Sequence, residues 1–139
     1  MRYVRFITPT ALSYGTQTTE PDLDAVAALL AACREAIGPD GKVYFGSFPS
    51  ELRPEHVTHE ALALIRRYTD GTSIIVGAQS GSDAVLDRAN RGHGTEEVER
   101  AVRVCVEAGF RPVVEVRRKL LEIRDVMWDC VARGTEIDA

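Results

Sequence analysis

Short apolar runs alternate with longer segments of helical periodicity along this chain. The runs are rich in β-branched and aromatic residues, which suit a pleated strand, and they span residues 3–7, 43–45, 73–77 and 113–116. The segments between them repeat apolar residues every three or four positions, as amphipathic helices do. The expected helices cover residues 21–38, 54 or 58–68, 82–89, 95–109 and 120–134. The pattern therefore predicts an α/β protein.

Strands that alternate with helices of this length favour parallel strands joined by right-handed crossovers. Each unit takes roughly 35 residues, close to the repeat of a (βα) barrel, so four consecutive βα units would make half of a TIM-like barrel. An open four-stranded parallel sheet is the other arrangement. We predict the half-barrel, as a single partial-barrel domain over residues 1–139. Both arrangements place ligands at the carboxyl ends of the strands.

The composition narrows the classes of function. With 45% hydrophobic and 27% charged residues, the chain resembles an ordinary soluble domain. Its formal net charge of −4 argues against a nucleic-acid partner, because sequence-independent binders are basic. No run approaches the roughly 20 apolar residues of a membrane span, and the opening segment does not resemble a signal peptide. We expect a cytoplasmic protein with no membrane partner, in which Cys33, Cys105 and Cys130 are reduced.

Three of the loops that follow the strands are polar and contain glycine. They read ITPTALSYG, GSFPSELRP and GAQSGSD, and they are expected at one edge of the sheet. The last of them offers backbone N–H groups and hydroxyls without bulk, which could hold a phosphate, a carboxylate or a ribose. A tight turn followed by a helix cap explains the same residues. The spacing matches neither the dinucleotide fingerprint nor the phosphate-binding loop with lysine.

Residues able to carry out catalysis are sparse. Glu51 and Arg53 lie at a strand end, where we expect a surface ion pair. His56 and His59 are interpreted as solvated residues at a helix start, and His93 as an exposed loop residue. No nucleophile, base and orienting group come together in the pattern. We predict no catalytic residue and no metal ligand.

The segment GAQSGSDAVLDRANRG and the helical stretch after it resemble the middle of the radical S-adenosylmethionine (radical SAM) barrel. The resemblance is closest to the branch that contains methylthiotransferases and cobalamin-domain radical enzymes. It extends over roughly Val4 to Pro112. The positions that match the family's strand-end block are Gly77, Gln79, Ser80, Gly81, Ser82, Val85, Leu86, Asn90, Arg91 and Gly92.

The resemblance implies a partial barrel that binds S-adenosylmethionine and an iron–sulfur cluster, which cleaves the cofactor to a 5′-deoxyadenosyl radical. Three cysteines spaced three and then two residues apart hold the family's cluster, and this sequence lacks that motif. The chain begins at what looks like the family's second strand. By the same resemblance, the cofactor-binding residues would be Thr8, Ser47, Gln79, Ser80 and Ser82, with Gly77 and Gly81 allowing close backbone approach.

Two main functional hypotheses follow. In the first, the chain is a truncated radical SAM-like segment without its own cluster, not catalytically competent alone, whose surviving activity is binding of S-adenosylmethionine or a nucleotide. In the second, it is a non-catalytic half-barrel scaffold. Two strand edges and an uncovered apolar sheet face would then drive self-association or pairing with a separately encoded barrel half. An unrelated α/β enzyme whose site the pattern does not show is a third.

Overall fold

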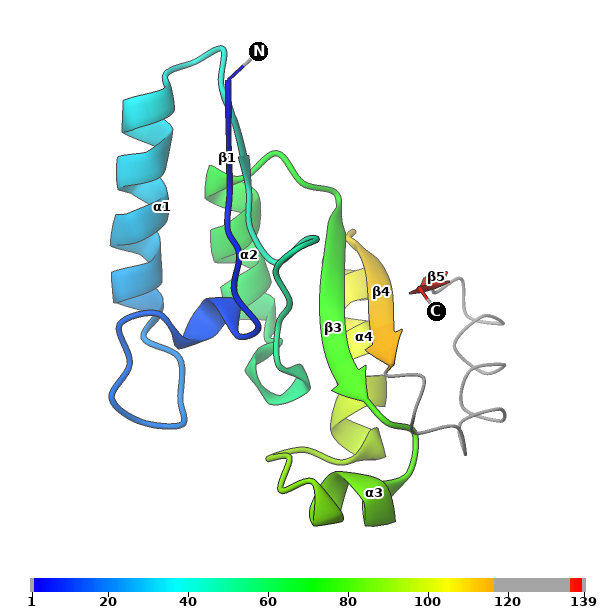
Figure 1. Cartoon of the computed structure of the whole chain (residues 1–139). Coiled ribbons are helices and arrows are strands. Elements are labelled where there is room, and N and C mark those ends of the chain that lie inside the picture. The colour runs from blue at the N-terminus through cyan, green and yellow to red at the C-terminus, as the bar shows by residue number, and fades with distance from the viewer. Residues whose placement is uncertain (1, 117–135, 139) are drawn as a thin grey trace.

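The computed structural model describes residues 2–116 and 136–138 (Figure 1). Its strands are β1 (Tyr3–Arg5), β2 (Lys42–Tyr44), β3 (Ser73–Gln79), β4 (Arg111–Val116) and β5 (Glu136–Asp138). Its helices are α1 (Leu23–Ile37), α2 (His59–Tyr68), α3 (Asp83–Arg88) and α4 (Thr95–Glu107), and the short 3₁₀ helices η1 (Ala11–Ser13) and η2 (Pro54–His56) lie in the loops. The α/β class predicted from the pattern is confirmed.

The first helix begins two residues later than predicted. Asp22 occupies the N-cap position, and its side chain accepts a hydrogen bond from the backbone N–H of Ala25 at 2.9 Å. Pro21 therefore precedes the helix instead of forming its first turn. An aspartate in this position satisfies one of the N–H groups that a helix start leaves unbonded. The predicted end at Gly38 holds, and that residue has the positive φ of +77° that favours glycine.

The strand pairs within the described residues are all parallel. β1 pairs with β2, while β3, β4 and β5 form a second ladder. Single bridges, Thr8 to Ser50 and Leu52 to Val76, extend the first ladder and join it to the second. The predicted helix over residues 120–134 lies outside the described residues, so four consecutive half-barrel units are not confirmed. The apolar pattern did not predict β5.

The strand that begins with β2 is interrupted by a loop of five residues, Ser47–Glu51. Ile75 in β3 donates its N–H to the carbonyl of Gly46 and accepts the N–H of Leu52, each at 2.8 Å. Both ends of the loop are therefore fixed to the same residue of the neighbouring strand. Gly46 has a φ of +68°, which lets the backbone turn out of the sheet here. The loop projects onto the face of the sheet opposite the helices.

One face of the sheet is packed against helices. α1, α2 and α4 lie along the same side of the strands, and α3 lies beyond the carboxyl end of β3 (Figure 1). Alternate strand residues point towards these helices, as a period of two requires, and form a large core cluster and a smaller one between β3, β4 and α4. The core includes Val26, Leu30, Val43, Phe45, Leu62, Ile65, Ile74, Val76, Ala101 and Cys105. None of the described helices has the length and apolar character needed to span a bilayer.

The intervening strand residues face away from the helices. Arg5, Tyr44, Ser73 and Arg111 lie on this side together with Ile75. The described part of this face is therefore mixed in character. We call it the open face. Separate cavities lie on this face, one beside the carboxyl ends of the strands and one beside the amino ends of β3 and β4.

Candidate functional site

At the carboxyl ends of the strands, the side chain of Glu51 lies across β3. A Cβ added to Gly77 would lie 2.8 Å from the Glu51 carboxylate, so any larger residue would force the Glu51 side chain to move. The side-chain amide of Gln79 lies 3.3 Å from both carboxylate oxygens of Glu51 and can donate to either. Gln79 is 5% exposed and has a φ of +66°, a conformation that costs energy for a residue with a side chain. These three residues form what we call the Glu51 cluster.

The Glu51 cluster adjoins a cavity of about 290 Å³. The walls of this carboxyl-end cavity come from the loops after β1 and β2 and from β3 and β4; they are Ile7, Thr8, Pro9, Phe48, Pro49, Ser50, Glu51, Ile75 and Glu115. Two carboxylates in one small cavity favour a ligand that carries positive charge or donates hydrogen bonds. Thr8 is held in place because its carbonyl accepts the N–H of Glu51 at 3.2 Å.

The predicted residues Ser80, Gly81 and Ser82 lie in the turn between β3 and α3. The hydroxyl oxygen of Ser80 accepts the N–H of Ser82 at 3.1 Å, and the N–H of Ser80 donates to the carbonyl of Ala78 at 2.8 Å. Ser80 is 1% exposed. The hydroxyl of Ser80 therefore shapes the turn, and none of the three residues lines the carboxyl-end cavity.

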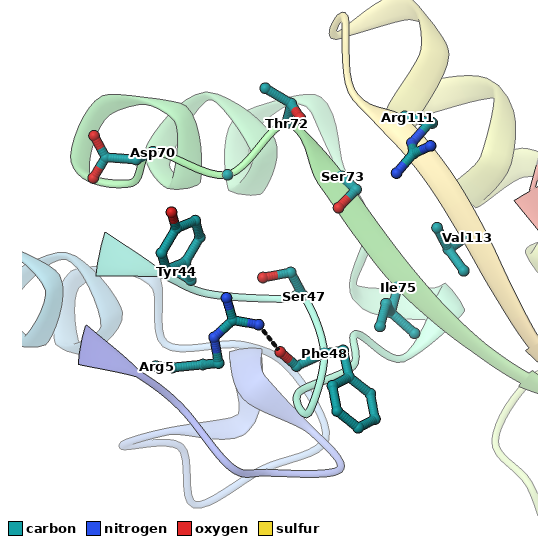
Figure 2. Close-up of a pocket in the computed structure, with 11 residues that line it drawn as sticks. Arg5, Tyr44, Ser47, Phe48, Asp70, Thr72, Ser73, Ile75, Arg111 and Val113 are labelled. Carbon is teal, nitrogen blue, oxygen red and sulfur yellow. Dashed lines mark hydrogen bonds between the residues drawn. The ribbon is translucent and has the colours of Figure 1, made fainter. Parts of the chain in front are cut away.

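Of the predicted site residues, the structure brings Thr8, Gly77 and Gln79 together around Glu51. Ser47 lines the other cavity of the open face (Figure 2). The sequence pattern indicates Glu51 as a polar group at a strand's carboxyl end and favours a surface ion pair for it. Glu51 contacts β3 because the loop after β2 comes back to the sheet at Leu52, which bonds to Ile75. This pairing is between distant segments, so no local sequence pattern predicts it. The one signal that pointed to Glu51 was an acidic residue at a strand's carboxyl end.

Arg53 pairs with Glu55, so the expected ion pair with Glu51 is wrong. The Nε atom of Arg53 donates to Glu55 at 2.6 Å, and Nδ1 of His93 lies 3.1 Å from the other carboxylate oxygen. Burial raises the pKa of the Glu55 carboxyl, but the interactions with His93, its own backbone N–H and Arg53 outweigh burial and lower it to about 2. Glu55 is therefore ionised at neutral pH.

His93 and His56 are buried, which contradicts the expectation of exposed residues. His93 is 6% exposed, and its Nε2 donates to the carbonyl of Ala78, 3.2 Å away. His56 is 4% exposed, with its Nε2 2.8 Å from the carbonyl of Thr19. Each ring links a loop to a distant segment of backbone. Only His59 is exposed, beside Glu107.

The described residues do not fit a cluster held by thiolates. Cys33 lies on α1 and Cys105 on α4, and Cys130 lies outside the described residues. Burial raises the pKa of the Cys105 thiol to about 12, so it stays protonated at neutral pH. Within residues 2–116 and 136–138, no group of three or more His, Cys, Asp or Glu could hold a metal ion.

Comparison with known proteins gives one family. The sequence model of the Radical SAM superfamily matches residues 2–118. The matched segment contains β1 to β4 and the residues that line both cavities of the open face. No curated protein matches the chain.

Proposed function

The chain belongs to the radical SAM superfamily, and we propose that it binds S-adenosylmethionine, or a nucleoside ligand of similar shape, at the carboxyl ends of β1, β2 and β3. The segment from Gln79 to Gly92 supports a place in the branch with methylthiotransferases and cobalamin-domain enzymes. The observation that carries the proposal is the Glu51 cluster beside its cavity. There a buried amide and a carboxylate are already oriented by the fold.

The chemistry of the cavity fits this ligand. S-adenosylmethionine carries a sulfonium and an ammonium group, and the carboxylates of Glu51 and Glu115 offer negative charge to both. Its ribose hydroxyls can donate to Glu51, whose carboxylate is oriented by the amide of Gln79. A cavity that already contains oriented partners loses less free energy on binding than a flexible one. The site thus recognises a cationic nucleoside.

We propose binding without a cluster formed by this chain's described residues. In the family, reductive cleavage of bound S-adenosylmethionine supplies a 5′-deoxyadenosyl radical. The thiol of Cys105 is buried and protonated, so it supplies no thiolate ligand for an iron–sulfur cluster. The roles left to Glu51, Gly77 and Gln79 are to bind and orient the cofactor.

Calorimetry with two ligands tests the proposal. S-adenosylhomocysteine lacks the sulfonium charge, so Glu51→Gln should weaken S-adenosylmethionine about tenfold, which corresponds to about 1.4 kcal/mol, and weaken S-adenosylhomocysteine less. Glu60→Gln, on the exposed surface of α2, is the matched control and should leave both affinities unchanged. Absence of binding to the unmodified chain, or equal binding by Glu51→Gln, contradicts the proposal.

A second candidate function is association through the edge of the sheet. Tyr3 and Ile7 on the β1 side are 63% and 86% exposed, and Phe48 is 70% exposed. Among the described strands, β1 has a neighbour on one side only, which leaves backbone groups for another strand. We therefore propose self-association or pairing with a complementary barrel half as the alternative. Light scattering tests it, and a strict monomer at high concentration counts against self-association.

A further inference from the structure

The larger cavity of the open face lies between the amino ends of β3 and β4 and the last residues of β1 and β2. Its volume is about 460 Å³, within the range of small-molecule sites. Its wall is made of Arg5, Tyr44, Ser47, Phe48, Asp70, Gly71, Thr72, Ser73, Ile75, Arg111 and Val113 (Figure 2). It shares only Phe48 and Ile75 with the wall of the carboxyl-end cavity. We call it the amino-end cavity.

Two arginines give the amino-end cavity a positive character. Arg5 and Arg111 lie on opposite sides of it (Figure 2). The guanidinium of Arg5 stacks over the Tyr44 ring at 4.6 Å and donates one hydrogen bond, of 2.5 Å, to the carbonyl of Phe48. A guanidinium carries five N–H donors, so this bond fixes its position and leaves donors for a ligand. The stacking and the hydrogen bond hold the charge at the cavity wall.

The acidic residue in the wall does not cancel the charge of Arg5. Asp70 binds Arg34 at 2.6 Å and Lys42 at 3.3 Å, and it also accepts the N–H of Val43 at 2.9 Å. Its charge is therefore balanced outside the cavity. In Figure 2 the carboxylate of Asp70 lies far from Arg111. The remaining polar groups of the wall include the hydroxyls of Thr72 and Ser73.

Ser47 supplies an independent indication of a ligand. The residue is 8% exposed, and its hydroxyl has no hydrogen-bond partner among the described residues. A buried hydroxyl without a partner costs free energy, and such a group calls for an explanation. Figure 2 shows this hydroxyl directed into the space beside Tyr44 and Arg5. A ligand oxygen in that space would satisfy it.

We propose that the amino-end cavity binds a small organic anion, whose phosphate or carboxylate accepts hydrogen bonds from Arg5 and Ser47. Arg111 adds a second positive charge at the opposite wall. The apolar part of the ligand lies against Ile75 and Val113, which are each 8% exposed. This ligand is distinct from the nucleoside proposed for the carboxyl-end cavity.

Nuclear magnetic resonance titration of the whole chain at constant ionic strength tests the site. The probes are phenyl phosphate, benzoate and the neutral benzyl alcohol. We expect saturable shifts at the amides of Ser47, Ser73 and Val113 with at least one of the two anions, and none with the alcohol. The better anion identifies the head group. Saturation by the alcohol with equal affinity, or saturation by none of the three, would overturn the proposal.

Two variants assign the contacts. Arg5→Gln should weaken the better anion at least tenfold, and Ser47→Ala should weaken it about threefold. Arg103→Gln changes the net charge equally on the exposed surface of α4 and should leave binding unchanged. Equal binding by Arg5→Gln, or an equal loss in Arg103→Gln, would overturn the assignment. Glu51→Gln separates the two proposals, because it should weaken S-adenosylmethionine and leave the anion unaffected.

Discussion

The two faces of the sheet differ in how fully their side chains are packed. On the helix side, Ile74 and Val76 are 0% exposed and lie in the core. On the open face, the neighbouring positions carry Ser73 and Gly77, beside cavities and charged groups. The same strand therefore contributes to stability with one set of residues and to binding with the other. Substitutions on the two faces should separate these properties.

The largest effect is expected on the packed face. Leu62 on α2 is 0% exposed, and Leu62→Ala should lower the free energy of unfolding by about 3 kcal/mol, because it removes buried methyl groups and leaves a cavity. Urea denaturation measures the change. Val106→Ala, at a position that is 51% exposed, should change it by less than about 0.5 kcal/mol. Similar losses in both variants would contradict the proposed difference.

Glu55 should show the next largest effect, and it should depend on pH. The pKa of its carboxyl is lowered from 4.5 to about 2, so the carboxylate stabilises the fold above about pH 4.5, and this contribution is lost as the pH falls towards 2. We expect Glu55→Gln to lower the free energy of unfolding by about 1–2 kcal/mol at pH 7, discounted for partial exposure.

Urea denaturation at pH 7 and at pH 2.5 measures this dependence. The gap between Glu55→Gln and the unmodified chain should narrow at the lower pH. Glu99→Gln, on the exposed surface of α4, should show little gap at either pH. A gap for Glu55→Gln that stays constant between these pH values would show that its ionisation does not stabilise the fold.

A smaller change in stability, with a clear change in binding, is expected at Gly77. Its new Cβ would displace the Glu51 carboxylate, which lies 2.8 Å away. We expect Gly77→Ala to cost about 1 kcal/mol of stability, since a flexible side chain can move, and to weaken S-adenosylmethionine about tenfold. Gly71→Ala is the control, because its nearest neighbour lies 3.8 Å away. If Gly77→Ala bound S-adenosylmethionine with unchanged affinity, Glu51 would not take part in binding it.

The smallest effect on stability, and of opposite sign, is expected at Ser47. Removal of its buried, unpartnered hydroxyl should leave the free energy of unfolding unchanged or raise it by up to about 1 kcal/mol, while anion binding weakens. Ser50→Ala is matched, because Ser50 also carries a buried hydroxyl without a partner among the described residues but lines the other cavity. It should change stability similarly and leave anion binding intact. Thermal unfolding and the titration above distinguish the two.

Local patterns predicted the elements because each depends on neighbouring residues. The apolar period of α4 and the apolar run of β3 could be read directly. The position of Glu51 over Gly77 could not, because it depends on pairing between segments that are 26 positions apart in the chain. The burial of His93 depends likewise on η2 and β3. Polar strand ends located the region of the candidate site, and tertiary contacts determined its members.

The residues that match the family's strand-end block, within 77–92, also fall into two groups. Gly77 and Gln79 face Glu51, whereas Asn90 and Gly92 serve the turn that follows α3. Asn90 has a φ of +51°, and a Cβ on Gly92 would lie 2.8 Å from the Arg53 side chain. A match to the block therefore combines residues that can meet a ligand with residues that close a loop. The sequence pattern alone does not distinguish the two groups.

The attachment of the Ser47–Glu51 loop has a consequence for how such a protein can change over evolution. Gly46 and Leu52 both bond to Ile75, and Glu51 bonds to Thr8, through backbone groups alone, so the side chains of the loop are not needed to hold it to the sheet. The loop residues border both cavities. Substitutions there can therefore alter which ligands are bound while strand register and core remain the same, so ligand preference can diverge between related proteins without a matching loss of folding stability.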